Sequence, residues 1–386
     1  MTFGKSAVFA TLLQALCLNA TAQIAVSSND NKAVLVDGVN TVVSNPPPDT
    51  VTLIDLNVSP PKVVGQVNVP GSWSAPPQSV AVAPDESIAI VTNSTKVDPN
   101  DPKKTVPDDT VTVIDLKATP PVVLQTLHGG RGPTGVSINR AGTLALVANR
   151  ADGTVSVLTI EGKTVRLAGK VDLGDPNCGA SLPVFTPDGT RAFVARNNDH
   201  KVSVLSVRGT TVEYTKRDIS ANLRPYGLEI TPDGKVAVVA NIGNGPTGGV
   251  DTVGVIDIAA DPPRLVDAVS VGLIPEGIAL SPRGDFLAVN VMNGSNLPKA
   301  SPYFHDVGVL KIMQLRGKTL TPLTETNVPG HWCEGVAWSK NQRTILVQCM
   351  VEKAIFVFDF DGRKLKAAGS IPVSGGPAGI RTADPR

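Results

Sequence analysis

One sequence pattern recurs along the chain and limits what it can fold into. In the copy at residues 237–258, an apolar run ends in Val-Ala-Asn, a glycine-rich loop follows, and Asp-Thr-Val begins a second apolar run. Related copies occupy residues 145–160 and 89–116. The alternation of apolar and polar residues and the β-branched content are typical of two strands joined by a loop. Because such units fill the chain, the sequence predicts an all-β repeat protein.

A recurring turn gives the repeat its length. A short strand runs into a turn of the Pro-Asp-Gly type, in which proline fixes φ, aspartate caps the turn and glycine accepts a positive φ. Successive copies begin 45 to 58 residues apart, which fits one four-stranded propeller blade per repeat. The six copies are residues 79–86, 135–142, 182–189, 227–234, 277–284 and 335–342.

The two ends of the repeat region predict how the ring closes. Residues 31–36 have the pattern of a second strand with no first strand before it, and residues 376–382 that of a first strand with no second strand after it. Pairing them makes one composite blade beside six complete ones and protects the sheet edges. We therefore expect residues 23–386 to form one domain, a seven-bladed β-propeller of four-stranded antiparallel blades.

The turns, together with Ile90-Val91-Thr92-Asn93 and Val147-Ala148-Asn149, resemble those of YVTN-repeat β-propellers, which are grouped with lactonase-like seven-bladed propellers. The resemblance covers nearly all of the chain after residue 22 and implies the propeller architecture. Members of that family include extracytoplasmic binding proteins, surface-layer components, partners of redox enzymes and sugar-lactone hydrolases. The resemblance therefore implies no single activity, and no catalytic motif of the family can be matched residue by residue.

The first 22 residues have the features of a secretory signal peptide. Lys5 precedes an apolar stretch at residues 7–18, and Ala20-Thr21-Ala22 fits the small-x-small cleavage pattern. The stretch is too short to span a bilayer; a buried N-terminal strand or helix is the alternative interpretation. We expect cleavage after Ala22 and a periplasmic or secreted monomer with no membrane span.

Composition and motifs argue against several functional classes. Basic and acidic residues are balanced, 35 against 34, so we expect no nucleic-acid partner. The four histidines are scattered, and neither a haem attachment motif nor an EF-hand loop is present, so we expect no metal and no cofactor. His200 and His305 take the place of an aspartate that precedes the third strand in other repeats, and we expect them to cap turns.

The long loops are predicted to lie on one face. In an antiparallel blade, the loops between the second and third strands share a face with the links between blades, which we name the loop face. The long insertions all belong to this set, at residues 38–49, 94–109, 242–251 and 292–305. Long loops on a rigid scaffold commonly carry binding sites, although proline-rich loops can also be spacers. We expect a small molecule or a partner protein to bind there.

Alignment of the turns places one residue per blade at the loop-face mouth of the central channel. These residues are Gln78, Thr134, Ser181, Tyr226, Glu276, Glu334 and Ala378. Arg131, Arg224, His331 and Trp332 lie just upstream of this set, and His128 lies in a link between blades. The ligand-binding candidates are Arg131, Arg224, Tyr226, Glu276, His331, Trp332 and Glu334.

Three interpretations of this mouth remain open. The residues can form a solvated polar rim held by ion pairs, or they can bind a ligand. They can also act as a hydrolase or lyase on a lactone or sugar acid, with Glu276, Glu334 and His331 as the catalytic candidates. Two carboxyl groups can serve as acid and base when their environments separate their pKa values.

Cys333 and Cys349 are predicted to form a disulfide. They lie the same number of residues before and after Asn341, the centre of a predicted hairpin, so they face each other on neighbouring strands. Opposed antiparallel residues have Cα atoms ~4.5 Å apart, which is within disulfide range, and an exported protein meets oxidising conditions. Two free buried thiols are the alternative, and Cys178 is expected to be free.

Overall fold

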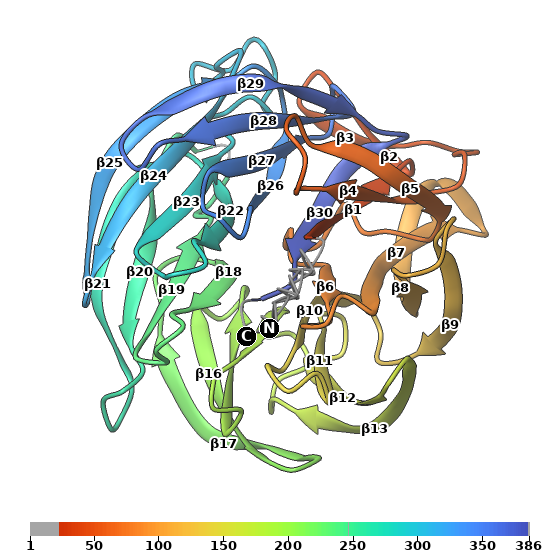
Figure 1. Ribbon diagram of the computed structural model, residues 1–386, viewed down its shortest axis with the longest axis vertical. Helices are drawn as coiled ribbons and strands as arrows, with labels where there is room; N and C mark the ends of the chain where they lie inside the picture. The colour runs from red at the N-terminus through yellow and green to blue at the C-terminus, as the bar shows by residue number, and fades with distance from the viewer. Residues whose placement is uncertain (1–22, 246, 385–386) are drawn as a thin grey trace, which may run out of the picture.

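The computed structural model describes residues 23–245 and 247–384, which form thirty β-strands and no helix. Seven antiparallel sheets of four strands each surround a central channel, and a two-stranded hairpin is added to them (Figure 1). The predicted seven-bladed propeller is therefore confirmed. Among the described residues, none belongs to a helix long and apolar enough to cross a membrane.

Each blade contributes one strand to each of four concentric positions. The strands nearest the channel are β30 (Gly376–Thr382), β6 (Val80–Val82), β10 (Pro133–Ile138), β14 (Ala180–Phe185), β18 (Pro225–Ile230), β22 (Pro275–Leu280) and β26 (Cys333–Trp338). The second strands are β1 (Ile24–Asp30), β7 (Ile88–Asp98), β11 (Leu144–Asn149), β15 (Arg191–Arg196), β19 (Val236–Asn241), β23 (Phe286–Val291) and β27 (Thr344–Cys349). The third strands are β4 (Thr50–Asp55), β8 (Asp101–Asp115), β12 (Thr154–Glu161), β16 (Lys201–Arg208), β20 (Asp251–Asp257), β24 (Gly308–Arg316) and β28 (Ala354–Phe360). The outer strands are β5 (Lys62–Asn68), β9 (Val122–His128), β13 (Thr164–Asp172), β17 (Thr211–Ser220), β21 (Arg264–Gly272), β25 (Thr319–Val328) and β29 (Leu365–Pro372).

The hydrophobic core lies between neighbouring blades. The cluster between the third and fourth blades contains Leu146 and Val157 from one sheet and Val194 and Leu205 from the next, all at most 3% exposed. Strand alternation sends these side chains to the faces between the blades, since successive residues of a strand point to opposite sides. Burial of each such side chain contributes roughly 1.5–3 kcal/mol, so the inter-blade contacts stabilise the ring as a whole.

An asparagine at the end of the second strand explains why the sequence pattern repeats. Asn149 is paired with Thr154 across β11 and β12, and its Nδ2 donates to Thr154 Oγ1 and Ser156 Oγ, both at 3.0 Å. In the closing blade, Asn29 Nδ2 donates in the same way to two threonines of β4, again at 3.0 Å. The side-chain amide thus fastens the loop-face end of each such pair of strands.

The ring closes through a different N-terminal strand from the one predicted. β1 pairs with β30, with Ser28 opposite Gly379, and residues 31–36 take no part in this sheet. The strand ends at Asp30 because its Oδ1 accepts hydrogen bonds from the backbone N–H groups of Lys32 and Ala33, at 2.6 and 3.1 Å. Pairing between the chain's N- and C-terminal strands is confirmed, but the assignment of the N-terminal partner to residues 31–36 is wrong.

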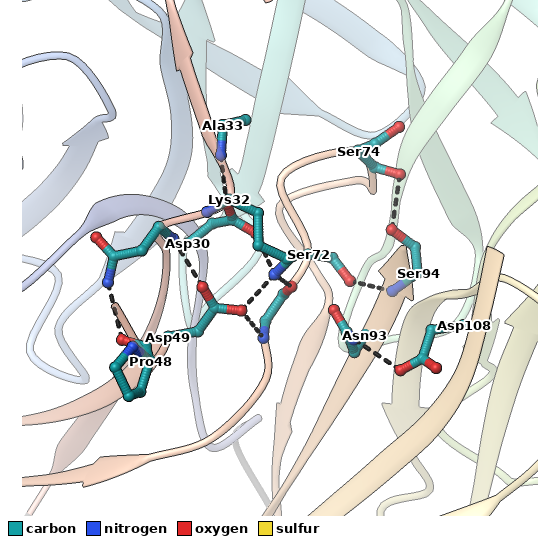
Figure 2. Close-up of polar contacts among 12 residues, drawn as sticks. Asp30, Lys32, Ala33, Pro48, Asp49, Ser72, Ser74, Asn93, Ser94 and Asp108 are labelled. Carbon is teal, nitrogen blue, oxygen red and sulfur yellow. Dashed lines mark hydrogen bonds and ion pairs between the residues drawn. The ribbon is translucent and has the colours of Figure 1, made fainter. Parts of the chain in front are cut away.

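Residues 33–42 instead form the extra hairpin, β2 (Ala33–Val36) and β3 (Val39–Val42). A buried ion cluster holds its base: Lys32 Nζ lies 2.6 Å from Asp30 Oδ2, contacts the Asp49 carboxylate and donates to Gly71 O at 2.7 Å. Figure 2 shows Asp49 also accepting from backbone N–H groups, so it ties the hairpin base to the closing blade.

Another predicted loop is largely strand. β7 extends to Asp98 and β8 begins at Asp101, so the segment 94–109 mostly continues the hairpin instead of forming an open loop. Asp108 stabilises the base of this extension, because it accepts from Asn93 Nδ2 at 2.7 Å (Figure 2). It also pairs with Lys96 Nζ at 3.0 Å. The β-propensity of Thr-Lys-Val and Thr-Val outweighs the prolines that suggested a loop.

Cys333 and Cys349 lie opposite each other on β26 and β27 and are joined by a disulfide, with Cα atoms 3.9 Å apart. Cys178 is a free, buried thiol, and burial raises its pKa to about 11. The disulfide fastens the loop-face end of β26, one residue before Glu334.

Candidate functional site

The seven residues predicted at the channel mouth all lie at the beginning of inner strands, or just before one in the case of Gln78, and all are buried. Two of them connect neighbouring blades. Thr134 Oγ1 donates to Ser181 O at 2.9 Å, and Ser181 Oγ donates to Tyr226 O at 3.3 Å. These two hydroxyls are used to join inner strands, so the chemistry of the mouth depends on the larger side chains.

A charged cluster occupies the sector of the third to sixth blades. Half-buried Arg150 and Arg224 converge on Asn197, whose Oδ1 accepts from Arg150 Nη2 at 2.8 Å and from Arg224 Nη2 at 3.5 Å. The Arg150 guanidinium also lies over the Tyr226 ring, 5.9 Å from its centroid. Glu276 holds the same position in β22 that Tyr226 holds in β18 of the neighbouring blade, and the charges of both arginines oppose the rise in its pKa that burial causes. Four blades therefore supply one cluster, which we name the arginine cluster: Arg150, Asn197, Arg224, Tyr226 and Glu276.

The backbone at Arg224 is strained. Arg224 has a φ of 59°, in the left-handed region, where glycines stand before β10 and β14 at positions 132 and 179. Most residues other than glycine avoid this region because of contact between Cβ and the backbone. Ile274 and Trp332 have a positive φ at the equivalent position before β22 and β26, so the sharp turn belongs to the link between blades, and Arg224 occupies a place where glycine would be less strained.

Burial and mutual repulsion control the two carboxyl groups. Burial raises the pKa of Glu276 to about 7, although Arg224 and Arg150 partly offset this. Burial, followed by the charge of Glu276, raises the pKa of Glu334 well above its usual value. Glu334 Oε2 has no hydrogen-bond partner among the described residues. Burial therefore favours the protonated form of both carboxyl groups, and Glu276 can exchange a proton near neutral pH.

His331 is less available than the sequence suggested. Its Nδ1 lies 2.8 Å from Glu352 Oε1 and its Nε2 lies 3.0 Å from Asp306 Oδ1, so carboxylates occupy both ring nitrogens. Burial lowers the pKa of His331, but the bonds to Glu352 and Asp306 outweigh this and raise it. The imidazole therefore joins the blade 7 link to the long loop before β24, and Phe304 stacks on it with centroids 6.4 Å apart.

Of the two remaining candidates, Trp332 is packed in an apolar cluster and Arg131 lies on the exposed rim of the mouth. Trp332 is 4% exposed and meets Trp73 edge-on, with ring centroids 6.0 Å apart, so it is part of an apolar cluster. Leu35 of the β2–β3 hairpin packs against the same cluster. The hairpin therefore covers the sector of the mouth near the closing blade. Arg131 is exposed on the rim, and its backbone N–H donates to Asp152 Oδ2 at 2.9 Å.

Polar side chains also line a hollow beside the arginine cluster. A cavity of about 490 Å³ includes Asn222 and Leu223, the two residues before Arg224. Thr252 Oγ1 accepts from Asn222 Nδ2 at 3.0 Å and from Asn241 Nδ2 at 3.1 Å, while Asn241 Oδ1 is buried without a partner among the described residues. Amides and hydroxyls at such a place can receive the hydroxyl groups of a polar ligand.

Two members of the cluster were missed in the sequence. Arg150 and Asn197 follow the second strands of their blades, and in sequence they resemble ordinary loop residues. Their common position after that strand is the signal that could have identified them. The expected roles of His200 and His305 fit their contacts, since His200 Nδ1 accepts from the Arg224 N–H at 3.2 Å and His305 Nδ1 lies 3.0 Å from Asn293 O. Within residues 23–245 and 247–384, no three acidic, histidine or cysteine side chains are grouped to hold a metal ion.

Comparison with known proteins supports the architecture. No family model matches the chain, and no curated protein matches its sequence. Among solved structures, the periplasmic gluconolactonase of Pseudomonas aeruginosa superimposes with a TM-score of 0.68 at 16% identity, covering 94% of this chain and 99% of that chain. A functionally unknown protein from Desulfotomaculum acetoxidans gives 0.67 at 15% identity, covering 87% and 96%. Hydrazine synthase from Kuenenia stuttgartiensis gives 0.62 at 19% identity, covering 82% and 91%.

Identities this low establish a common fold and nothing about activity, because one fold carries many functions. In fold, the chain matches lactonase-like, YVTN-type seven-bladed β-propellers at low sequence identity, as the sequence predicted.

Proposed function

We propose that the protein is an exported binding protein that holds a small polyhydroxylated acid on its loop face, with the acid group on Arg150 and Arg224. The observation that carries the proposal is the incomplete bonding of these two guanidinium groups. Arg150 Nη1 is buried without a partner among the described residues. Both Arg224 contacts, to Asn197 Oδ1 and Gly243 O, are long, at 3.5 Å.

Charge favours an anion with a single acid group. Two arginines lie near three carboxyl groups, Glu276, Glu334 and Asp251, and burial raises the pKa of each of these carboxyl groups, which favours their uncharged forms. Both guanidinium groups keep their charge, and a guanidinium can hold a carboxylate through two parallel hydrogen bonds.

The neighbouring polar cavity favours hydroxyl groups on the same ligand. Its volume of about 490 Å³ suits a small molecule, and Asn222, Asn241 and Thr252 offer amide and hydroxyl groups on one side of it. The similarity in fold to a protein described as a gluconolactonase makes an aldonic acid, such as gluconate, a sensible first probe.

Calorimetric titration of residues 23–386 with gluconate tests the proposal, with sorbitol as the uncharged control. We expect gluconate to bind, sorbitol to bind at least about tenfold more weakly, and Arg150→Gln or Arg224→Gln to weaken gluconate binding about tenfold or more. Arg208→Gln, which changes an exposed arginine at the end of β16, is the matched control and should leave binding unchanged. Equal binding of gluconate and sorbitol would overturn the proposal.

A second candidate, hydrolysis of a lactone, is favoured by one specific observation, the pKa of about 7 at Glu276 beside two arginines. In that reaction, Glu276 takes a proton from water as the water oxygen bonds to the ring carbonyl carbon. The ring C–O bond then breaks as Glu276 returns the proton to the ring oxygen, and the hydroxy acid leaves. Glu276→Gln should abolish turnover of glucono-1,5-lactone above the spontaneous rate while gluconate still binds. If the wild-type protein does not exceed the spontaneous rate, only the binding proposal remains.

A further inference from the structure

A separate cavity lies in the central channel, at the face opposite the arginine cluster. This face carries the Pro-Asp-Gly turns, and we name it the turn face. The cavity has a volume of about 610 Å³, and residues of all seven blades line it, including the turn prolines Pro84, Pro187, Pro232 and Pro282. Cavities of this size commonly hold small molecules. The proposed loop-face function does not use any part of it.

The wall of this turn-face cavity is mainly apolar. Inner strands supply aliphatic and aromatic side chains, among them Ile138, Leu182, Val184, Leu228, Leu280 and Trp338. Trp338 Nε1 donates to Ala279 O at 3.0 Å, so the indole presents no free donor and its ring acts as an apolar surface. The body of a molecule that fits here is therefore apolar.

Charged side chains of the turns, among them Glu86, Arg140 and Lys340, line the outer end of the cavity, and at its inner end two contacts cross the channel. Arg381 of β30 pairs with Glu229 of β18, and Gln78 Nε2 donates to Ile278 O at 3.2 Å. The strands involved belong to blades that are not neighbours in the ring. These contacts separate the turn-face cavity from the loop-face mouth.

Only one nitrogen of the Arg381 guanidinium bonds to Glu229 across the channel. Its Nη1 bonds to Glu229, which is buried, whereas its Nη2 donates at 3.1 Å to Asp384 Oδ1, whose side chain is 61% exposed. Asp384 lies three residues further along, where the chain leaves the sheet, and it lines the cavity too. A carboxylate with a largely exposed side chain thus already occupies the outward side of the guanidinium.

Two further polar atoms in the wall have no hydrogen-bond partner among the described residues. They are Gln78 Oε1 and Ser137 Oγ, both buried and both from residues that line the cavity. Buried polar atoms without partners are rare in folded proteins and cost free energy unless something completes them. A bound molecule with a hydroxyl or N–H group could complete either one.

From this arrangement we propose that the turn-face cavity binds a small molecule with an apolar body and a single carboxylate, which takes the place of Asp384 on Arg381. The apolar wall accommodates the body, and the outward Nη2 of Arg381 accepts the acid group. A dianion such as phosphate is disfavoured because Glu229 lies on the same guanidinium. The Asp384 side chain then acts as an internal competitor that the ligand displaces.

The test compares acids with their uncharged amides by calorimetric titration at neutral pH. Benzoate and hexanoate are the probes, and benzamide and hexanamide are the matched controls of the same shape. We expect each acid to bind at least about tenfold more tightly than its amide. Asp384→Asn, which removes the competing charge and keeps the shape, should tighten benzoate binding roughly three- to tenfold. Amides that bind as well as the acids, or an Asp384→Asn variant with unchanged affinity, would overturn the proposal.

Substitution of Arg381 tests the proposal independently. The double variant Arg381→Gln with Glu229→Gln removes both charges of the buried pair together, so neither is left unpaired, and benzoate binding should fall at least about tenfold. Arg316→Gln, an exposed arginine at the end of β24, is the control and should change nothing. Retained binding in a folded double variant would refute the role of Arg381. If that variant does not fold, the acid–amide and Asp384→Asn comparisons still decide the proposal.

Discussion

Lys32 Nζ lies 2.6 Å from Asp30 Oδ2 and also contacts the Asp49 carboxylate, so two buried aspartates share one buried ammonium group. This relationship joins three parts of the chain: the end of β1, the base of the β2–β3 hairpin and the start of β4. Removing one partner from a buried ion cluster leaves charges without compensation, which costs far more than the loss of a surface pair.

Lys32→Met should therefore destabilise the protein by about 3 kcal/mol or more at pH 8. The loss should be smaller at pH 5, because burial, opposed by Lys32, raises the pKa of Asp30 to about 6 against an ordinary 3.8. A raised carboxyl pKa means that the folded state holds its proton below about pH 6, so one uncompensated charge disappears there.

Urea denaturation at the two pH values measures this difference. Lys163→Met is the matched control, because Lys163 pairs with Asp115 at 2.6 Å but is 43% exposed. Its loss should stay below about 1 kcal/mol at both pH values. Similar losses for the two variants would show that the Lys32 cluster behaves like a surface ion pair.

The fold could be predicted because the signals that specify it are local and repeated. The Pro-Asp-Gly turns and the Asn…Asp-Thr-Val pattern mark strand ends directly, and their spacing defines a blade. The closing strand was misassigned because Ser28 and Asp30 weaken the apolar pattern of residues 24–30, whereas Ala33-Val34-Leu35-Val36 has a stronger one. The bonds of Asn29 to Thr50 and Thr52 show the missed signal, an asparagine in the same place as Asn149.

The candidate site was predictable only in part. Tyr226, Glu276 and Glu334 could be placed because they follow a fixed position relative to the turn of each blade. Arg150 and Asn197 were missed, because their shared position after the second strand is their only local signal, and their contacts with Arg224 and Tyr226 form between blades. The turn-face cavity could not be predicted either, because its size depends on the width of the channel between the inner strands, and that width is set by the closed ring as a whole.

The strained backbone at Arg224 should reverse the usual effect of glycine on stability. Because its φ is 59°, Arg224→Gly should be more stable than Arg224→Ala by about 1 kcal/mol, although glycine ordinarily destabilises. The comparable pair at Arg150, which is not among the residues of positive φ, should show the ordinary order, with the alanine variant the more stable. Thermal denaturation of the four variants measures both differences. If the alanine variant is the more stable one at both positions, Arg224 carries no strain.

Ring closure through β30 predicts a large effect of truncation. A chain ending at Ser374 lacks the inner strand of the closing blade, including Ile380, which is 1% exposed and packs with Ala25 and Leu346. We expect a much lower and less cooperative thermal transition, because the sheet edge of β1 would be left open. Ile380→Ala in the full chain, which keeps the strand, should lose only about 2–5 kcal/mol. A truncated chain that melts like the full one would contradict closure by β30.

The disulfide between Cys333 and Cys349 closes a short loop with a sequence separation of 16 residues. In the chain-entropy description, a loop of this length stabilises the folded state by about 3 kcal/mol. The double variant Cys333→Ala with Cys349→Ala should lose roughly this amount, measured by urea denaturation. Addition of a reductant should then lower the stability of the wild type but not of the variant. Cys178→Ala, which removes a buried free thiol, should retain the response to reductant.

The pKa of Glu276 predicts how stability depends on pH. Burial raises it to about 7, against an ordinary value of 4.5, so between these two values the folded state binds a proton that the unfolded state has lost. Stability is therefore full below pH 4.5 and falls as the pH rises through about 7. A shift of this size corresponds to about 3 kcal/mol, shared with Glu334 because each carboxyl affects the other.

Glu276→Gln cannot titrate, so its free energy of unfolding should decline less between pH 5 and pH 8 than that of the wild type. Glu325→Gln, at a carboxylate that is 61% exposed, should keep the wild-type slope. Urea denaturation at half-unit intervals of pH measures the slopes, and parallel curves for Glu276→Gln and the wild type would show that Glu276 ionises normally in the folded protein.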